Sequence, residues 1–84
     1  MQQVESHSDR IHAFISEKFP LAKKLKLGPN DNLLESGAVD SLGMLDLVSY
    51  LQTEFGIEIS DDELLPENFQ SVQTITAFVQ SKLN

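Results

Sequence analysis

The sequence predicts an all-α fold: a small four-helix bundle with three longer helices, one short helix and a long ordered loop between helices 1 and 2. Apolar residues recur at helical spacing in three segments, and turn or capping residues separate these segments. The short alternating segment 57–59 has no partner strand, so we expect an extended loop there. Because 84 residues leave room for only one hydrophobic core, we expect a single domain over residues 1–84.

The first helix is expected from about residue 3 to Phe19, with Ser6 or Ser8 as its N-cap. Pro20 ends the regular part of this helix, because proline cannot donate the next backbone hydrogen bond. A further helical turn over residues 22–25 is left open by the same pattern.

The segment that follows begins with dense turn chemistry at residues 28–32 and runs as a loop to Asp40. This loop carries Leu33, Leu34 and Val39, which are too apolar to remain in water. We therefore expect the loop to be ordered, with these side chains folded onto the helices.

The second helix is expected over residues 41–55, with Gly56 as its C-terminal stop. Its predicted inner side follows the helical period through Leu42, Leu45, Leu47, Val48, Leu51 and Phe55.

Ser60 and Glu63 have the spacing of a capping box and predict the start of a short third helix, which Pro66 ends. The last helix begins near Ser71, and its predicted inner side consists of Val72, Ile75, Phe78, Val79 and Leu83.

The charge of the chain is strongly segregated. Its formal net charge is −7, and residues 27–81 contain ten Asp and Glu residues but no Lys or Arg. This distribution disfavours nucleic acid and anionic membranes as partners and favours basic protein patches. Acidity that serves only solubility explains the composition equally well at this point. No apolar run is long enough to insert into a membrane, and we expect a monomeric cytoplasmic protein.

We expect no catalytic residue and no metal site in this chain. There is no cysteine, which excludes thiolate chemistry. The only histidines, His7 and His12, are five residues apart on the first helix, which places them about 140° apart around its axis. The acidic run 61–63 lacks the alternating ligands and the glycine of a calcium loop.

Asp40 and Ser41 form a plausible helix start, with Asp40 as the N-cap. A hydroxyl at that place lies beside unpaired backbone N–H groups and the positive end of the helix dipole. A phosphate ester on Ser41 would therefore be stabilised there, although a plain capping role explains the same two residues.

Residues 33–75, which contain LLESGAVDSLGMLDLVSYLQTEFGIEISDDELL, resemble the acyl, peptidyl and D-alanyl carrier proteins. In that family the serine of an Asp-Ser-Leu motif receives 4′-phosphopantetheine from coenzyme A. The resemblance rests on the combined spacing of Leu33-Leu34, Gly37, the motif at residues 40–42 and the segment 55–59. It implies that Ser41 is the attachment residue and that Asp40 helps to place the metal-bound coenzyme A of the modifying enzyme.

The resemblance also implies partners: a phosphopantetheinyl transferase, an acyl- or aminoacyl-loading ligase or synthetase, and a downstream transferase or synthase. The second helix would be the main recognition surface, with apolar anchors and flanking acidic groups. The implied recognition residues are Leu42, Gly43, Met44, Leu45, Asp46, Glu54, Asp61, Asp62 and Glu63.

Gly43 departs from the fatty-acid carriers, which usually have an acidic residue two positions after the serine. The Asp-Ser-Leu-Gly sequence looks more like D-alanyl carriers and stand-alone carriers of aminoacyl or specialised pathways. We expect Gly43 to leave room near the arm for a partner. The expected bundle interior near the arm consists of Leu47, Phe55, Ile59, Leu64, Ile75 and Phe78.

Two functions follow. The first is a stand-alone carrier that holds an acyl or aminoacyl thioester on a Ser41-linked arm. The alternative is an acidic helical adaptor that docks basic proteins without a prosthetic group. A phosphopantetheine on Ser41 distinguishes them.

Overall fold

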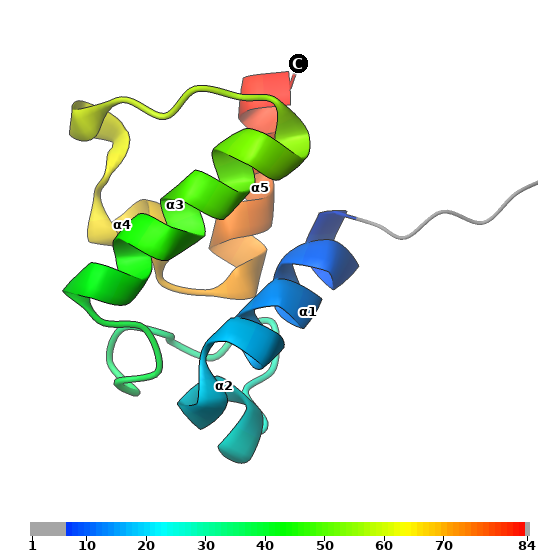
Figure 1. The fold of residues 1–84 in the computed structure, drawn as a ribbon, viewed down its shortest axis with the longest axis vertical. Coiled ribbons are helices and arrows are strands. Elements are labelled where there is room, and N and C mark those ends of the chain that lie inside the picture. Colours follow the sequence, from blue (N-terminus) through cyan, green and yellow to red (C-terminus); the bar gives the residue numbers. More distant parts are fainter. Residues whose placement is uncertain (1–6, 84) are drawn as a thin grey trace, which may run out of the picture.

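The computed structural model describes residues 7–83, and this part of the chain is helical without strands (Figure 1). The all-α prediction is therefore confirmed. The α-helices are α1 (His7–Lys18), α2 (Pro20–Lys24), α3 (Ser41–Phe55), α4 (Pro66–Phe69) and α5 (Val72–Leu83), and a 3-10 turn, η1, spans Asp61–Glu63.

The three longer helices, α1, α3 and α5, form the body of the bundle. In Figure 1, α3 lies in front of α5, α1 lies beside α3, and η1 and α4 occupy the opposite edge. The core draws on every α-helix and on the loop before α3. Its most deeply buried side chains are Ile11, Ile15, Leu33, Val39, Leu47, Leu51, Phe69, Val72, Ile75 and Val79.

The long loop between α2 and α3 is ordered, as its apolar residues predicted. Leu33 and Val39 are fully buried, and Leu34 packs against the core. The Leu33 N–H donates to the Gln70 carbonyl at 2.6 Å, and the Val39 N–H donates to the Leu33 carbonyl at 3.1 Å. These bonds satisfy backbone groups that burial would otherwise leave without a partner, and they fix the loop just before α3.

The N-terminal predictions are met in part. A start near residue 3 and a cap at Ser6 lie outside the described residues, and Ser8 lies inside α1, so Ser8 is not its cap. The additional turn after Pro20 exists as α2, with Pro20 as its first residue. Proline suits that position because its fixed φ is helical and its missing N–H would have no helical acceptor.

The predicted short third helix is wrong in its bounds. The capping box of Ser60 and Glu63 forms, but it closes only the three-residue turn η1. Pro66 does not end a helix; it is the first residue of α4. The same property of proline that stops one helix suits the first turn of the next.

The predicted inner stripe of α3 is also partly wrong. Leu47, Val48 and Leu51 are buried, but Leu42 and Leu45 are 74% and 58% exposed. In α5, Val72, Ile75 and Val79 are buried and Phe78 is partly buried, whereas Leu83 is exposed. Leucines lie all around α3, so their spacing alone does not single out one inner face.

Candidate functional site

Ser41 is the first residue of α3, and Asp40 caps that helix as predicted. The Gly43 N–H donates to Asp40 Oδ1 at 2.7 Å, and the Met44 N–H donates to the Asp40 carbonyl at 2.8 Å. The N–H groups of Ser41 and Leu42 have no acceptor within the helix, as in any helix first turn. Ser41 is exposed. Its hydroxyl therefore lies at the positive end of a four-turn helix, open to an approaching enzyme.

A hollow of about 450 Å³ lies directly beside Ser41. Most of its exposed lining is apolar, and it joins the ordered loop, the first turn of α3 and the start of α4. Its lining residues are Leu34, Val39, Asp40, Ser41, Met44 and Pro66. A flexible chain attached to the Ser41 oxygen can lie in this hollow without displacing a core side chain. The residues present therefore fit a covalently attached arm.

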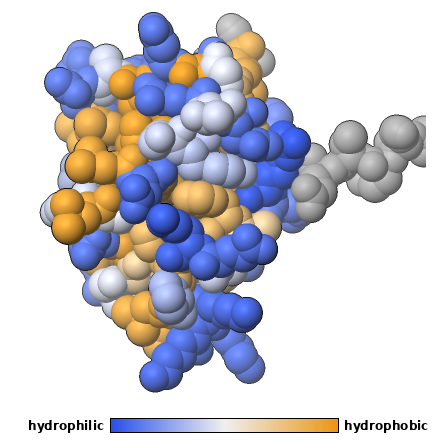
Figure 2. Space-filling view, viewed as in Figure 1, coloured by the Kyte–Doolittle hydropathy of each residue, from blue (hydrophilic) through white to orange (hydrophobic). Residues whose placement is uncertain are grey.

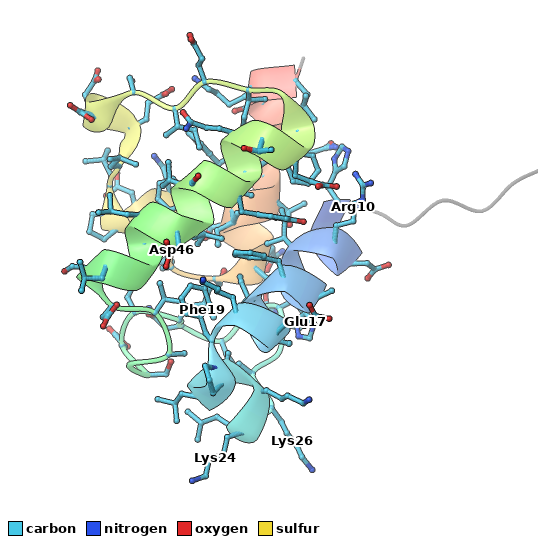
Figure 3. The ribbon with its side chains drawn as sticks, viewed as in Figure 1. Arg10, Glu17, Phe19, Lys24, Lys26 and Asp46 are labelled. Atoms are coloured by element: carbon cyan, nitrogen blue, oxygen red, sulfur yellow. The ribbon has the colours of Figure 1, made fainter. Side chains whose placement is uncertain are left out.

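Gly43 does not leave open space near Ser41, so that prediction is wrong. Gly43 is buried and faces Phe19. Figure 3 labels Phe19, which lies between α1 and α2. A Cβ at Gly43 would lie 2.6 Å from Phe19 Cε1 and 3.2 Å from Asp40 Oδ1. The glycine thus lets the Phe19 ring pack against the first turn of α3.

The recognition residues predicted on α3 fall into two groups. Leu42 and Leu45 project into solvent, and Met44 lies partly buried at the hollow. The carboxylates are already engaged with α1: Asp46 Oδ2 lies 3.8 Å from the Lys18 ammonium, and Glu54 Oε2 lies 3.1 Å from the Arg10 guanidinium.

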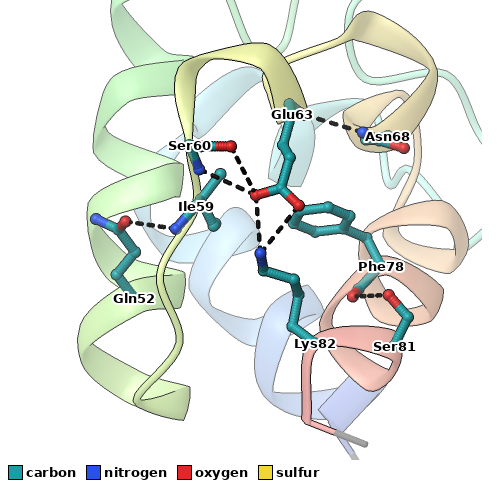
Figure 4. Close-up of polar contacts among 8 residues, drawn as sticks. All are labelled: Gln52, Ile59, Ser60, Glu63, Asn68, Phe78, Ser81 and Lys82. Atoms are coloured by element: carbon teal, nitrogen blue, oxygen red, sulfur yellow. Dashed lines mark hydrogen bonds and ion pairs between the residues drawn. The ribbon is translucent and has the colours of Figure 1, made fainter.

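In the acidic cluster 61–63, two carboxylates are exposed and the third is paired with a lysine. Asp61 and Asp62 are exposed. Glu63 instead accepts from the Ser60 N–H at 3.0 Å and from the Lys82 ammonium at 2.8 and 2.9 Å (Figure 4). The hydrogen bonds from Lys82 and Ser60 hold the pKa of Glu63 below its ordinary value. Glu63 therefore joins η1 to α5.

Of the six residues expected in the bundle interior near the arm, two are fully buried and four are partly buried. Leu47 and Ile75 are fully buried. The other four side chains, those of Phe55, Ile59, Leu64 and Phe78, are partly buried and pack against the core.

Sequence reasoning missed the residues of α1 that face α3. Arg10 and Lys18 are eight residues apart, as are Asp46 and Glu54. That matched spacing is the signal that could have indicated their pairing, because residues eight apart share one face of a helix.

Residues 7–83 contain no group of three His, Cys, Asp or Glu side chains placed to hold a metal ion. No helix in this part of the chain is both long enough and apolar enough to cross a membrane.

The exposed serine at the aspartate-capped start of α3, beside an apolar hollow, offers a place where a covalently attached arm fits. Residues 9–79 match the family model described as "Phosphopantetheine attachment site". The chain belongs to this family of carrier proteins. Family membership confirms that the group it carries is covalent 4′-phosphopantetheine and that the chain is a carrier rather than an enzyme.

Relatives from several bacteria support this assignment. The chain is 35% identical over 74 residues to an acyl carrier protein of Buchnera aphidicola subsp. Acyrthosiphon pisum (strain 5A), covering 88% of this chain and 89% of the relative. It is 36% identical over 66 residues to the probable acyl carrier protein PigG of Serratia sp. (strain ATCC 39006), covering 79% and 76%. An acyl carrier protein of Thermosynechococcus vestitus is 28% identical over 75 residues, 89% of each chain.

Proposed function

We propose that Ser41 is the attachment residue and that the chain carries an acyl or aminoacyl group as a thioester on its arm. The observation that carries this proposal is the exposed Ser41 hydroxyl at the N-terminus of α3, beside the apolar hollow. The bound group supplies the thiol, which the chain itself lacks because it has no cysteine.

Attachment requires one substitution at phosphorus. The Ser41 oxygen forms a bond to the phosphorus that carries the pantetheine half of coenzyme A, and the pyrophosphate P–O bond breaks. Adenosine 3′,5′-bisphosphate leaves, and the hydroxyl proton passes to a base of the transferase or to water. The first-turn N–H groups and the helix dipole then stabilise the phosphate anion at Ser41. Asp40 keeps that turn formed through its bond to the Gly43 N–H.

Acyl cargo fits the surroundings of Ser41 better than charged aminoacyl cargo. Leu34, Val39, Met44 and Pro66 line the hollow, and the only charged group among its lining residues is the Asp40 carboxylate. Burial of an ammonium group among apolar side chains costs free energy that an alkyl chain does not. The resemblance to aminoacyl carriers rested in part on Gly43, and the packing of Phe19 gives that glycine a structural role.

The proposed partners are a phosphopantetheinyl transferase, an acyl- or aminoacyl-loading ligase or synthetase, and a downstream transferase or synthase. In the same proposal, residues 1–84 form one domain that works as a monomer in the cytoplasm. A carrier that visits several enzymes in turn needs contacts that form and break quickly, which small surface docking sites provide.

Intact-mass measurement after modification tests the proposal. Purified protein is incubated with coenzyme A, Mg²⁺ and a broad-specificity phosphopantetheinyl transferase, beside Ser41→Ala and the matched control Ser49→Ala, which alters another exposed serine of α3. We expect one phosphopantetheine on the wild type and on Ser49→Ala, and none on Ser41→Ala. Modification of Ser41→Ala contradicts the assignment. A folded but unmodified wild type, with partner binding that survives Ser41→Ala, supports the adaptor alternative.

A further inference from the structure

The outer edge of the contact between α1 and α3 is a three-layer zipper. Arg10, Phe14 and Lys18 follow one another at four-residue intervals on α1, and Glu54, Tyr50 and Asp46 do so on α3, in the opposite direction. The layers are two ion pairs, Arg10–Glu54 at 3.1 Å and Lys18–Asp46 at 3.8 Å, and between them the stacked rings of Phe14 and Tyr50.

Two layers of the zipper, the Phe14–Tyr50 ring pair and the Arg10–Glu54 ion pair, make further close contacts. The Phe14 and Tyr50 rings lie 3.9 Å apart between centroids and are inclined by only 7°. The Arg10 guanidinium also lies 5.9 Å from the centroid of the Phe55 ring, within reach of a cation–π contact. The Arg10 guanidinium thus contacts both Glu54 and Phe55, whereas the Lys18–Asp46 pair is more open to solvent, with 48% and 58% of the two side chains exposed.

In the zipper, each charged side chain of α3 forms an ion pair with a basic side chain of α1. The helix has two ionisable carboxylates, Asp46 and Glu54, and no basic residue. Both carboxylates face a cation of α1, so the helix that begins at Ser41 presents no unpaired charge. The nearby capping group, Asp40, already accepts a hydrogen bond within the first turn.

What α3 does present is an uncharged stripe next to Ser41. Leu42, Leu45, Ser49 and Thr53 are all exposed, and at about 100° per residue they lie within one narrow arc of the helix. The same angular count places this arc between Ser41 and the zipper. Figure 2 shows hydrophobic surface over the N-terminal part of α3, with hydrophilic surface above it where η1 lies.

Given a carrier with its arm on Ser41, we propose that Arg10 and Lys18 determine partner specificity by neutralising α3, so that the carrier docks an apolar, uncharged recess. The occupant is a surface of the arm-handling enzymes that receives Leu42 and Leu45 and lacks a basic patch opposite Asp46 and Glu54. Charge complementarity carries this assignment: a neutral stripe matches a neutral recess, and an unpaired charge at its edge would have to be desolvated on docking.

The test uses the transferase as the docking enzyme and the KM of the carrier as the readout. The base-removal variant Arg10→Gln/Lys18→Gln leaves both carboxylates unpaired, and the acid-removal variant Asp46→Asn/Glu54→Gln leaves both cations unpaired. The quadruple variant combines all four changes and restores neutrality. Lys23→Gln/Lys24→Gln is the control for net charge, because these exposed lysines lie on α2 and belong to neither ion pair of the zipper. Figure 3 shows Lys24 pointing away from α3.

The proposal predicts that both double variants raise KM by about three- to fivefold, and that the quadruple variant returns to within about twofold of the wild type. Leu45→Ala raises KM by about tenfold, as expected for a central apolar anchor. A basic docking surface would give another pattern: base removal lowers KM, and acid removal and the quadruple variant both raise it. That pattern overturns the proposal.

Failure of the specificity proposal and failure of the carrier proposal give different results. If Ser41 is not the attachment residue, the Ser41→Ala protein is still modified or the wild type gains no mass. If only the specificity proposal is wrong, all variants are modified at Ser41 and only the order of their KM values changes. Circular dichroism on each variant establishes that it is folded.

Discussion

Gly43→Ala offers the most specific test of the packing around Ser41. In an ordinary helix this change stabilises by up to about 1 kcal/mol, because alanine has the higher helix propensity. Here the new Cβ would lie 2.6 Å from Phe19 Cε1 and 3.3 Å from Phe19 Cζ. The ring cannot move freely: it is only 8% exposed and packs edge-on against Phe14 at 6.2 Å.

The helix-propensity gain and the overpacking cost have opposite signs, and their difference sets the expected change in the free energy of unfolding. Overpacking a filled core costs about 1–3 kcal/mol, which exceeds the propensity gain. We therefore expect Gly43→Ala to lower the free energy of unfolding by about 1 kcal/mol. For a domain of this size, that lowers Tm by about 4–8 °C. Thermal unfolding followed by circular dichroism measures it, with Ser49→Ala as the matched control on the exposed side of α3.

A second substitution, at Phe19, tests whether contact with this ring causes the destabilisation by Gly43→Ala. Phe19→Leu removes the ring edge that the new Cβ would meet. In the Phe19→Leu background, Gly43→Ala should be neutral or stabilising, so the destabilisation seen in the wild-type background should disappear. A Gly43→Ala protein that melts at or above the wild-type temperature, or that is destabilised equally in both backgrounds, would show that Phe19 is not the obstacle.

Three further predictions concern helix ends and the η1 contact. Asp40→Ala removes the acceptor of the Gly43 N–H and should lower the free energy of unfolding in urea by about 1 kcal/mol, whereas Asp40→Asn should cost much less. Gly56 has φ 64°, so Gly56→Ala should destabilise by about 1 kcal/mol and Gly56→Asn by less, as differential melting would show. Because Lys82 lowers the pKa of Glu63, their contact stabilises the fold above the ordinary glutamate pKa of about 4.3 and is lost as pH falls through the lower folded-state value. Lys82→Met should therefore reduce the acid-dependent loss of stability, and an unchanged pH profile would contradict this.

The sequence predicted best where one residue has a strong local effect on the backbone. The observed bounds of α3 are the predicted ones, because Asp40 caps its first turn and Gly56 adopts the left-handed conformation that ends it. The loop before α3 was predicted to be ordered because Leu33 and Val39 could not remain in water, and both are buried. These features depend on local chemistry and on burial alone.

Predictions failed where tertiary contacts decide the outcome. Leucines at 42, 45, 47 and 51 surround α3, so only the approach of α1 and α5 determines which of them are buried. The close contact of Gly43 with Phe19 joins residues 24 positions apart (43 − 19), and neither residue indicates the other in the sequence. Pro66 could end one helix or begin the next, and the local pattern favoured the wrong alternative.

In the candidate site, too, the locally determined residues were predicted and the tertiary contacts were not. Ser41 and Asp40 were identified from a short motif and a family resemblance, and the structure places them at the expected helix start. The pairing of Asp46 and Glu54 with α1 could not be predicted from α3 alone, because it depends on the register between two helices. The charge that this face of α3 presents is therefore a property of the α1–α3 pair.

Peptide-level mass spectrometry of the protein isolated from its own host would show whether Ser41 carries the prosthetic group in the cell. Because no Lys or Arg lies between residues 27 and 81, trypsin leaves Ser41 in one long peptide, and fragmentation of that peptide locates any modification. We expect 4′-phosphopantetheine on Ser41, with part of the population bearing an acyl thioester. Phosphopantetheine on another serine, or its absence from protein that still supports its pathway, would contradict the assignment of Ser41 as the attachment residue.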